Sequence, residues 1–350
     1  MKKINIGGFE ISDESPVFII AELSANHNGS LETAIETIRA AKRTGADAIK
    51  FQTYTADTIT LDSRKDDFKL KQGTIWDGKF LHDLYQEAYT PWEWHKQLFD
   101  AAKEEGLVCF SSPFDFTAVD LLEELNAPAY KIASFEITDI PLIEYVASKG
   151  KPVIISTGIA ELEDIELALD ACKRMGNEEI VLLKCTSSYP APIDEANLTM
   201  IRDFRERFGV HSGLSDHTMG NTVPIVSVAM GAKVIEKHFI LDHSIGGPDA
   251  SFSLDEKEFT ELVKAVREAS SSIGQVQYSL TDKQRKGRDF SRSLYVSENM
   301  TAGEVISEKN VRSVRPGFGL HPRHYSSIIG KKVNKDLEKG TAFKLDFIAE

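Results

Sequence analysis

The amino-acid sequence predicts a (β/α)8 barrel followed by a small, mostly β module. Short apolar runs recur along the chain, and most are followed by a stretch with apolar residues at helical spacing. Eight such runs over about 270 residues match the barrel in number and length. The structural alternative is a doubly wound open sheet. That fold more often carries a GxGxxG turn after its first strand, and the sequence has no such turn there.

The eight apolar runs are the predicted barrel strands. They span Val17–Glu22, Asp47–Gln52, Leu107–Ser111, Ala129–Ala133, Pro152–Ser156, Ile180–Cys185, Val210–Leu214 and Lys233–His238. Between most of them lies an amphipathic segment such as Ser30–Thr44, with Ile35 and Ile38 at helical spacing. Ser30 is the expected N-cap of this helix, and Gly45 is its expected stop.

The interval between the second and third predicted strands, Thr53–Glu105, is too long for one loop and one helix. It contains all three tryptophans of the chain, Trp76, Trp92 and Trp94. Catalytic residues of a barrel lie at the C-terminal ends of its strands. An insertion at that end is therefore a candidate lid or specificity loop.

The pattern changes after Gln275. Residues 1–275 form the predicted barrel, residues 276–290 a polar linker, and residues 291–350 a module of short strands and turns. About 60 residues are marginal for independent stability. We therefore expect this module to dock on a barrel, either its own or that of a partner.

Composition excludes several classes of protein. The net charge of −13 argues against nucleic acid as a partner. No apolar run approaches the length of a membrane span, and the N-terminus lacks the apolar core of a signal peptide, so a cytoplasmic location is expected. The three cysteines, Cys109, Cys172 and Cys185, are widely spaced without a CxxC, which argues against disulfides and structural zinc.

Every predicted strand ends in polar residues. They are Glu22; Lys50 and Gln52; Ser111 and Ser112; Lys131, Ser134 and Glu136; Ser156 and Thr157; Lys184, Ser187, Ser188 and Tyr189; Ser215, Asp216 and His217; and Glu236 and His238. A single polar residue at a strand end more often caps a turn than takes part in catalysis. Polar residues at all eight ends, by contrast, predict a functional site at that rim of the barrel.

Two histidines suggest a metal site. His217 and His238 end neighbouring strands, and they can share one divalent ion, with Glu22 or Glu236 and waters completing an octahedron. A pair of core histidines bonded to the backbone is an equally strong alternative.

The inward-facing lysines suggest an anionic ligand. Lys50 and Lys131, with serine hydroxyls around them, suit a carboxylate and a phosphate held together. A barrel lysine can instead form a Schiff base with a carbonyl substrate. Trapping with borohydride separates these two hypotheses.

At these residues the chain resembles the sialic acid synthase family, over essentially its full length. The matching stretches are FIIAELSANHNGS, GADAIKFQT, YKIASFEITDIPLI, ISTG, CTSSYPAP, GLSDHT and GAKVIEKHF. In the last module, SRSL and VRPGFGL resemble the antifreeze-like (SAF) domain of those enzymes. The insertion GTIWDGKFLHDLYQEAYTPWEWH and the first loop are most similar to the branch that makes pseudaminic acid. CTSSYPAP departs from the neuraminate synthases, since Ser187 stands where they often have asparagine.

The resemblance implies a transferase that condenses phosphoenolpyruvate with an open-chain amino sugar and releases phosphate by C–O cleavage. The implied sugar is 2,4-diacetamido-2,4,6-trideoxy-β-L-altropyranose. The alternatives are N-acetylmannosamine or a 2,4-diacetamido-trideoxymannose, which give neuraminate or legionaminate. A non-catalytic carbohydrate-binding or surface-assembly protein remains a further alternative, although such a protein need not keep every charged strand end.

The resemblance also assigns roles to residues. Mn²⁺ or Mg²⁺ on His217 and His238 would polarise the sugar aldehyde. Glu22 would orient or deprotonate the attacking water or a sugar hydroxyl, with Glu136 as the alternative base. The implied phosphoenolpyruvate contacts are Lys50, Lys131, Ser134, Ser156, Ser187 and Ser215. The implied sugar contacts are Gln52, Tyr189, Asp249 and Arg315, the last supplied by the SAF domain across a homodimer.

Overall fold

The computed structural model describes residues 1–71, 73 and 76–349. Gln72, Thr74 and Ile75 of the predicted insertion, and Glu350 of the last module, lie outside the described residues. The chain divides into two compact units, Met1–Gly274 and Gln275–Glu350.

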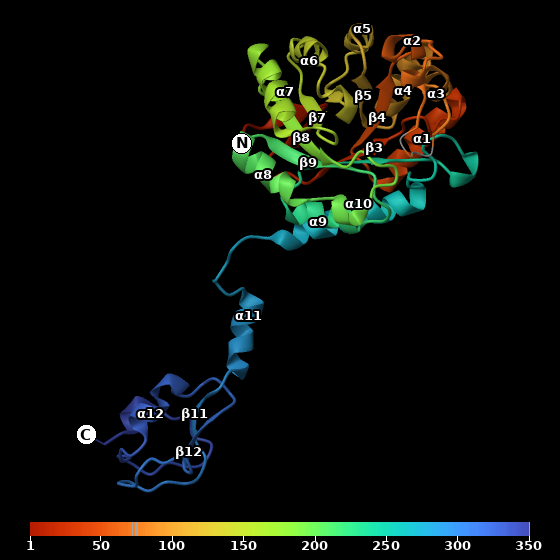
Figure 1. Cartoon of the computed structure of the whole chain (residues 1–350). Coiled ribbons are helices and arrows are strands. Elements are labelled where there is room, and N and C mark those ends of the chain that lie inside the picture. The colour runs from red at the N-terminus through yellow and green to blue at the C-terminus, as the bar shows by residue number, and fades with distance from the viewer. Residues whose placement is uncertain (72, 74–75, 350) are drawn as a thin grey trace. The chain divides into compact units, whose positions relative to one another are not determined.

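The first unit is a closed barrel of parallel strands surrounded by helices (Figure 1). In the described part of the chain its eight strands are β3 (Phe18–Glu22), β4 (Ala48–Thr53), β5 (Val108–Pro113), β6 (Tyr130–Ile132), β7 (Val153–Ser156), β8 (Ile180–Cys185), β9 (His211–Asp216) and β10 (Val234–His238). Each strand pairs with its neighbours in the sequence, and β10 closes the ring on β3. The predicted fold class is confirmed, and every predicted strand matches an observed one to within two residues at each end.

Helices on the outside cover the barrel. They are α1 (Leu31–Thr44), α4 (His95–Glu104), α5 (Phe116–Glu124), α6 (Ile140–Ala147), α7 (Leu162–Arg174), α8 (Thr199–Phe208), α9 (Thr222–Ala229) and α10 (Glu256–Ile273). The ends of α1 are those that the sequence predicts. The Ser30 side chain accepts a hydrogen bond from the Thr33 amide, and Gly45 adopts the left-handed conformation that ends the helix, with φ 84°.

A short N-terminal hairpin, which the sequence did not predict, closes one end of the barrel. It consists of β1 (Ile4–Ile6) and β2 (Phe9–Ile11). Its buried isoleucines pack in one cluster with Phe18, Phe110 and Ile154, which lie toward the N-terminal ends or middle of their strands. The C-terminal ends of the strands lie at the opposite rim, away from the hairpin.

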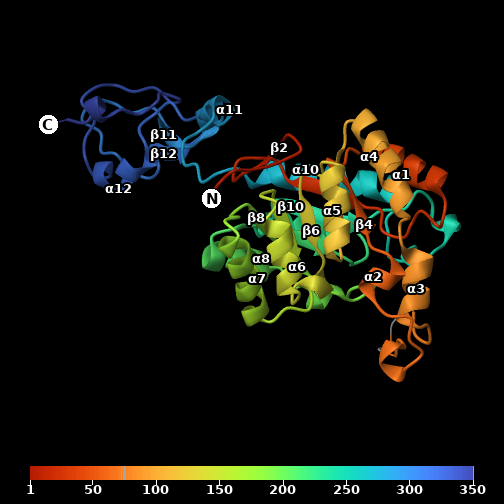
Figure 2. The ribbon, with the colours of Figure 1, turned by 90° about the horizontal axis from the view of Figure 1, so that it is seen from above.

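The long interval between β4 and β5 contains α2 (Ala56–Ile59), α3 (Leu81–Ala88) and short 3-10 turns ahead of the barrel helix α4, and the part around α3 projects from the barrel (Figure 2). Trp76 ties it to the C-terminal rim. The Trp76 indole N–H donates to the Pro248 carbonyl at 3.3 Å, and its ring packs against Tyr189 with the centroids 5.6 Å apart. The insertion therefore reaches the loops that follow β8 and β10.

The second unit has its own small core. Its elements are α11 (Asp282–Gly287), β11 (Ser293–Val296), β12 (Val311–Val314) and α12 (Tyr325–Ile328), and α11 lies in the segment predicted as a linker. Leu294, Val311, Ile328 and Phe343 are fully buried at its centre. None of the described helices is both long and apolar enough to cross a membrane.

Candidate active site

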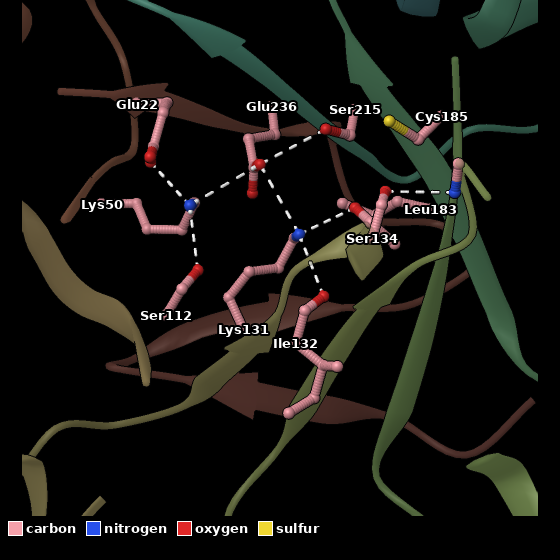
Figure 3. Close-up of polar contacts among 12 residues, drawn as sticks. Glu22, Lys50, Ser112, Lys131, Ile132, Ser134, Leu183, Cys185, Ser215 and Glu236 are labelled. Carbon is pink, nitrogen blue, oxygen red and sulfur yellow. Dashed lines mark hydrogen bonds and ion pairs between the residues drawn. The ribbon is translucent and has the colours of Figure 1, made fainter. Parts of the chain in front are cut away.

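A buried network of charges lies at the C-terminal rim of the barrel (Figure 3). Lys50 Nζ lies 2.7 Å from Glu22 Oε2 and 3.7 Å from Glu236 Oε1, and it donates to Ser112 Oγ at 3.2 Å. The strand register explains the first contact, because Lys50 on β4 is the pairing partner of Glu22 on β3. Buried charges of this kind are stable only when they are paired.

Lys131 joins the same network from β6. Its Nζ lies 3.7 Å from Glu236 Oε1 and donates to Ser156 Oγ at 2.7 Å. Ser215 Oγ donates to Glu236 Oε1 at 3.4 Å. Glu236 therefore lies between the two lysines and shares Lys50 with Glu22.

Burial sets the protonation of the carboxyl groups. Burial raises the pKa of Glu22 to about 7; the Lys50 ammonium opposes this rise, and the Glu236 carboxylate adds to it. Burial also raises the pKa of Glu136 to about 7. Both groups can therefore exchange protons near neutral pH, as general acid–base catalysis requires.

Gly158 allows three loops to meet beside this network. Its amide donates to Ser134 Oγ at 3.1 Å. A Cβ at position 158 would lie 2.1 Å from Ser187 Oγ and 2.7 Å from Ser134 Oγ. Only glycine permits both hydroxyls to approach this backbone so closely. The result is a group of short donors suited to an anion.

His217 and His238 lie together, with ring centroids 5.2 Å apart. His217 Nδ1 lies 3.1 Å from the Thr186 carbonyl, which is the arrangement that orients a metal-binding imidazole so that its other nitrogen is available. His238 Nδ1 is buried without a hydrogen-bond partner among the described residues, 3.7 Å from Asp249 Oδ2. A buried polar atom without a partner is costly. The unpartnered nitrogen of His238 fits a ligand of a divalent cation, whereas the backbone contact of His217 fits both a metal-binding and a structural histidine.

A second group of possible metal ligands lies elsewhere on the barrel unit. His243, Asp255 and Glu258 present ligand atoms within 4.8 Å of one another. Asp255 and Glu258 form the capping box of α10, and His243 Nδ1 lies 3.1 Å from the Ala250 carbonyl. Capping of the helix accounts for most of these contacts, so this group carries no argument for a metal.

A cavity of about 680 Å³ opens above the charged network. Of the predicted site residues, its lining includes Gln52, Ser134, Glu136, Ser187, Tyr189, His238 and Asp249. Glu22, Lys50, Lys131, Ser156, Ser215 and His217 are buried outside that lining. Arg315 directly follows β12 in the second unit, Gln275–Glu350.

One wall of the cavity is apolar. It is built mainly by the insertion, through Ile59, Leu70, Trp76, Leu81, Leu84 and Tyr85. The lining also includes the polar residues Ser134, Ser187 and Glu136. The cavity therefore offers both apolar and polar contacts to a ligand.

Comparisons with known proteins agree with this arrangement. A sequence profile of the NeuB family matches residues 37–278, and one of the SAF domain matches residues 291–349. The chain belongs to the NeuB family. The resemblance to the sialic acid synthases is therefore confirmed.

Relatives within the family are similar over nearly the whole chain. A pseudaminic acid synthase of Campylobacter jejuni is 50% identical over 341 residues, which is 97% of this chain and 98% of that protein. A pseudaminic acid synthase of Helicobacter pylori is 46% identical over 334 residues, covering 95% and 98%. The crystal structure of an N-acetylneuraminic acid synthetase from Leptospira borgpetersenii, in complex with citrate, superposes with a TM-score of 0.73. It is 30% identical and covers 82% of this chain and 95% of its own.

Some residues of this NeuB-family site were missed by the sequence analysis. Glu236 was considered only as a metal ligand, whereas the structure places it between two lysines. Ser112 was noted at a strand end without a role, and it accepts from Lys50. Ser24 was not singled out, although it lines the cavity and contacts both Gln52 and Asp249. Residue type alone gives no signal for Ser24, because its position depends on the conformation of a loop.

Proposed function

We propose that this chain is a pseudaminic acid synthase, condensing phosphoenolpyruvate with 2,4-diacetamido-2,4,6-trideoxy-β-L-altropyranose to give pseudaminic acid and phosphate. The observation that carries the proposal is 50% identity over 97% of the chain to an enzyme of that name. The buried charges, the two histidines and the apolar wall each support it independently.

Phosphoenolpyruvate is assigned to the lysine side of the site. Its carboxylate and phosphate are held by Lys50, Lys131, Ser134, Ser156, Ser187 and Ser215. In the free protein Glu22 and Glu236 neutralise the lysines, so an incoming anion competes with carboxylates. Protonation of Glu22, whose pKa is raised to about 7 by burial, removes the nearer of the two carboxylates that compete for Lys50 and leaves only Glu236, 3.7 Å away.

The sugar is assigned to the cavity. Gln52, Tyr189 and Asp249 line it, which supports their assignment as contacts of the open-chain aldehyde form. The apolar wall complements a 6-deoxy sugar, because a methyl group there meets Ile59, Leu84 and Tyr85 instead of water. A hydroxymethyl group in that place would lose its hydrogen bonds to solvent.

His217 and His238 are the residues that would hold Mn²⁺ or Mg²⁺. A divalent ion bound there supplies Lewis-acid polarisation of the aldehyde oxygen. Glu22 then has the role of orienting the water that adds at carbon 2 of the former phosphoenolpyruvate, and the fraction that remains a carboxylate can take a proton from that water or from a sugar hydroxyl. Glu136 is the alternative base, since its pKa is raised to the same value. Carbon 3 of phosphoenolpyruvate forms the new bond to the aldehyde carbon, and the former aldehyde oxygen takes up a proton. Water adds at carbon 2 with loss of a proton, and that carbon then releases phosphate with C–O cleavage.

Arg315 is assigned to the N-acetyl group of the sugar. In this proposal the chain forms a homodimer, and the SAF domain of one protomer supplies Arg315 to the barrel of its partner. The support is the SAF match over residues 291–349 together with the RPGFG sequence.

The test is product formation by the purified chain. With phosphoenolpyruvate, Mn²⁺ and the altrose derivative, we expect one phosphate to be released for each product formed. The mass of the product should equal the mass of the sugar plus that of pyruvic acid. Phosphoenolpyruvate labelled with ¹⁸O in its bridging oxygen should deliver the label to phosphate. Failure to release phosphate with any amino sugar would favour a carbohydrate-binding protein. A borohydride-stable adduct on Lys50 or Lys131 would favour the Schiff-base reaction.

A further inference from the structure

Ser24, in the loop after β3, holds an unfavourable backbone conformation. Its φ is 48°, in the left-handed region that residues with a Cβ seldom adopt. Its side chain is buried at the edge of the cavity. Glycine would adopt this conformation without cost, so serine at this position indicates that the hydroxyl has a role.

The hydroxyl links two residues assigned to the sugar. Ser24 Oγ donates to Asp249 Oδ2 at 2.5 Å and accepts from Gln52 Nε2 at 2.9 Å. The same Gln52 nitrogen donates to Glu22 Oε1 at 3.0 Å. A chain of contacts therefore runs from Glu22 through Gln52 and Ser24 to Asp249.

One lone pair of Ser24 Oγ has no hydrogen-bond donor among the described residues. A hydroxyl has one hydrogen and two lone pairs. The hydrogen is used by Asp249 and one lone pair by Gln52, and within the described residues no other donor reaches Oγ. The remaining lone pair belongs to an atom at the cavity wall, so a ligand in the cavity can donate to it.

We propose that Ser24 is a specificity-determining residue that fixes the Asp249 carboxylate and accepts a hydrogen bond from an acetamido N–H of the sugar. This inference rests on the proposed function for the identity of the sugar. Within the described residues Ser24 makes no direct hydrogen bond to Lys50, Lys131 or Ser134 and reaches Lys50 only through Gln52 and Glu22, so its loss should affect the sugar more than phosphoenolpyruvate.

Two substitutions separate the effect of the hydroxyl from the effect of the backbone conformation. Ser24→Gly removes the hydroxyl and relieves the left-handed conformation, whereas Ser24→Ala removes the hydroxyl and keeps the strain. Asn28→Gly is the matched control. Asn28 lies in the same loop with φ 45°, and its Nδ2 donates to the Ile245 carbonyl and not to a cavity residue.

We expect both Ser24 variants to raise the KM for the sugar roughly tenfold or more while the KM for phosphoenolpyruvate stays within about twofold. Ser24→Gly should have a higher Tm than Ser24→Ala, since both lose the hydroxyl and only glycine relieves the strain. Asn28→Gly should bind the sugar as the wild type does. Equal effects on both substrates, or wild-type KM values for Ser24→Gly, would overturn the inference.

A double comparison tests the acetamido contact itself. Analogues of the sugar that carry an azido group in place of the acetamido group at carbon 2 or at carbon 4 lack the N–H. The wild type should discriminate against one of these analogues by roughly tenfold, and Ser24→Gly should lose that discrimination. Discrimination that is unchanged in Ser24→Gly would contradict the contact.

Binding of the borohydride-reduced, open-chain sugar, measured by calorimetry, does not depend on turnover. If the wild type releases no phosphate but Ser24→Gly binds the reduced sugar more weakly than the wild type does, the proposed reaction is contradicted and the inference on Ser24 is supported. If the wild type turns over normally and Ser24→Gly binds the reduced sugar as the wild type does, the proposed reaction is supported and the inference on Ser24 is contradicted. No binding to the wild type would overturn both.

Discussion

Lys50 on β4 and Glu22 on β3 are register partners in the barrel, and their side chains form a buried ion pair of 2.7 Å. Glu236 shares the same lysine from a position two residues before His238 on β10. The pair therefore connects the proposed anion site to the proposed metal site. Its removal should affect folding and catalysis in different ways.

Lys50→Met should lower the Tm by roughly 5–10 °C, because it leaves Glu22 without its partner in a buried environment. Adding Glu22→Gln should restore most of the lost Tm, since the unpaired charge is then gone. Both variants should release no phosphate. Thermal unfolding followed by circular dichroism checks the first two outcomes. An unchanged Tm in Lys50→Met would show that the ion pair does not stabilise the barrel.

Binding of phosphoenolpyruvate should take up protons between about pH 7 and pH 8. Burial places the pKa of Glu22 at about 7, with Lys50 opposing the rise. An anion bound at the lysines raises this pKa further, so a fraction of Glu22 becomes protonated on binding. Uptake should fall toward zero well below pH 7, where Glu22 already carries its proton. Calorimetry in buffers of different ionisation enthalpy measures it. Equal uptake by Glu22→Gln would assign the proton to another group.

His238→Ala should abolish turnover, in metal-replete buffer, without unfolding the barrel. Its Nδ1 lacks a partner among the described residues, so little hydrogen bonding is lost with it. His243→Ala is the control, because His243 belongs to the second group of possible ligands near α10. It should retain turnover and its sensitivity to a chelator. Turnover by the wild type after exhaustive chelation would show that the reaction does not require a metal ion.

Arg315→Ala should raise the KM for the sugar far more than the KM for phosphoenolpyruvate. Equal changes in both would count against the assigned contact.

Mixing the Arg315→Ala variant with the His238→Ala variant tests whether each barrel receives Arg315 from the other protomer of the dimer. If it does, exchanged dimers contain one intact site, and about a quarter of the wild-type activity should return. If each barrel uses the Arg315 of its own chain, mixing should restore nothing.

The barrel could be predicted from the sequence because its signals are local. Strands such as Val234–His238 are short apolar runs, and Ser30 and Gly45 mark the ends of α1 by their own chemistry. The N-terminal hairpin gave no such signal, because its strands have three residues each and the residues they pack against, such as Phe110 and Ile154, lie far along the chain.

The site could be predicted only in part, because some of its residues depend on contacts between segments that are distant in the sequence. The identities of Lys50, Lys131, His217 and His238 followed from their positions at strand ends. The bridging role of Glu236 depends on side-chain distances across the barrel. That of Ser24 depends on a left-handed turn and on Asp249, which is 225 residues away in the sequence.

The most direct test of the account is a comparison of kcat/KM for three sugars with saturating phosphoenolpyruvate and Mn²⁺. These are the 2,4-diacetamido-2,4,6-trideoxy-altrose, the corresponding trideoxymannose and N-acetylmannosamine. We expect the altrose derivative to lead N-acetylmannosamine by tenfold or more, since the apolar lining favours a 6-deoxy sugar. We expect it to lead the trideoxymannose as well, because the chain is 50% identical to a pseudaminic acid synthase. An equal or higher kcat/KM for N-acetylmannosamine would contradict the account.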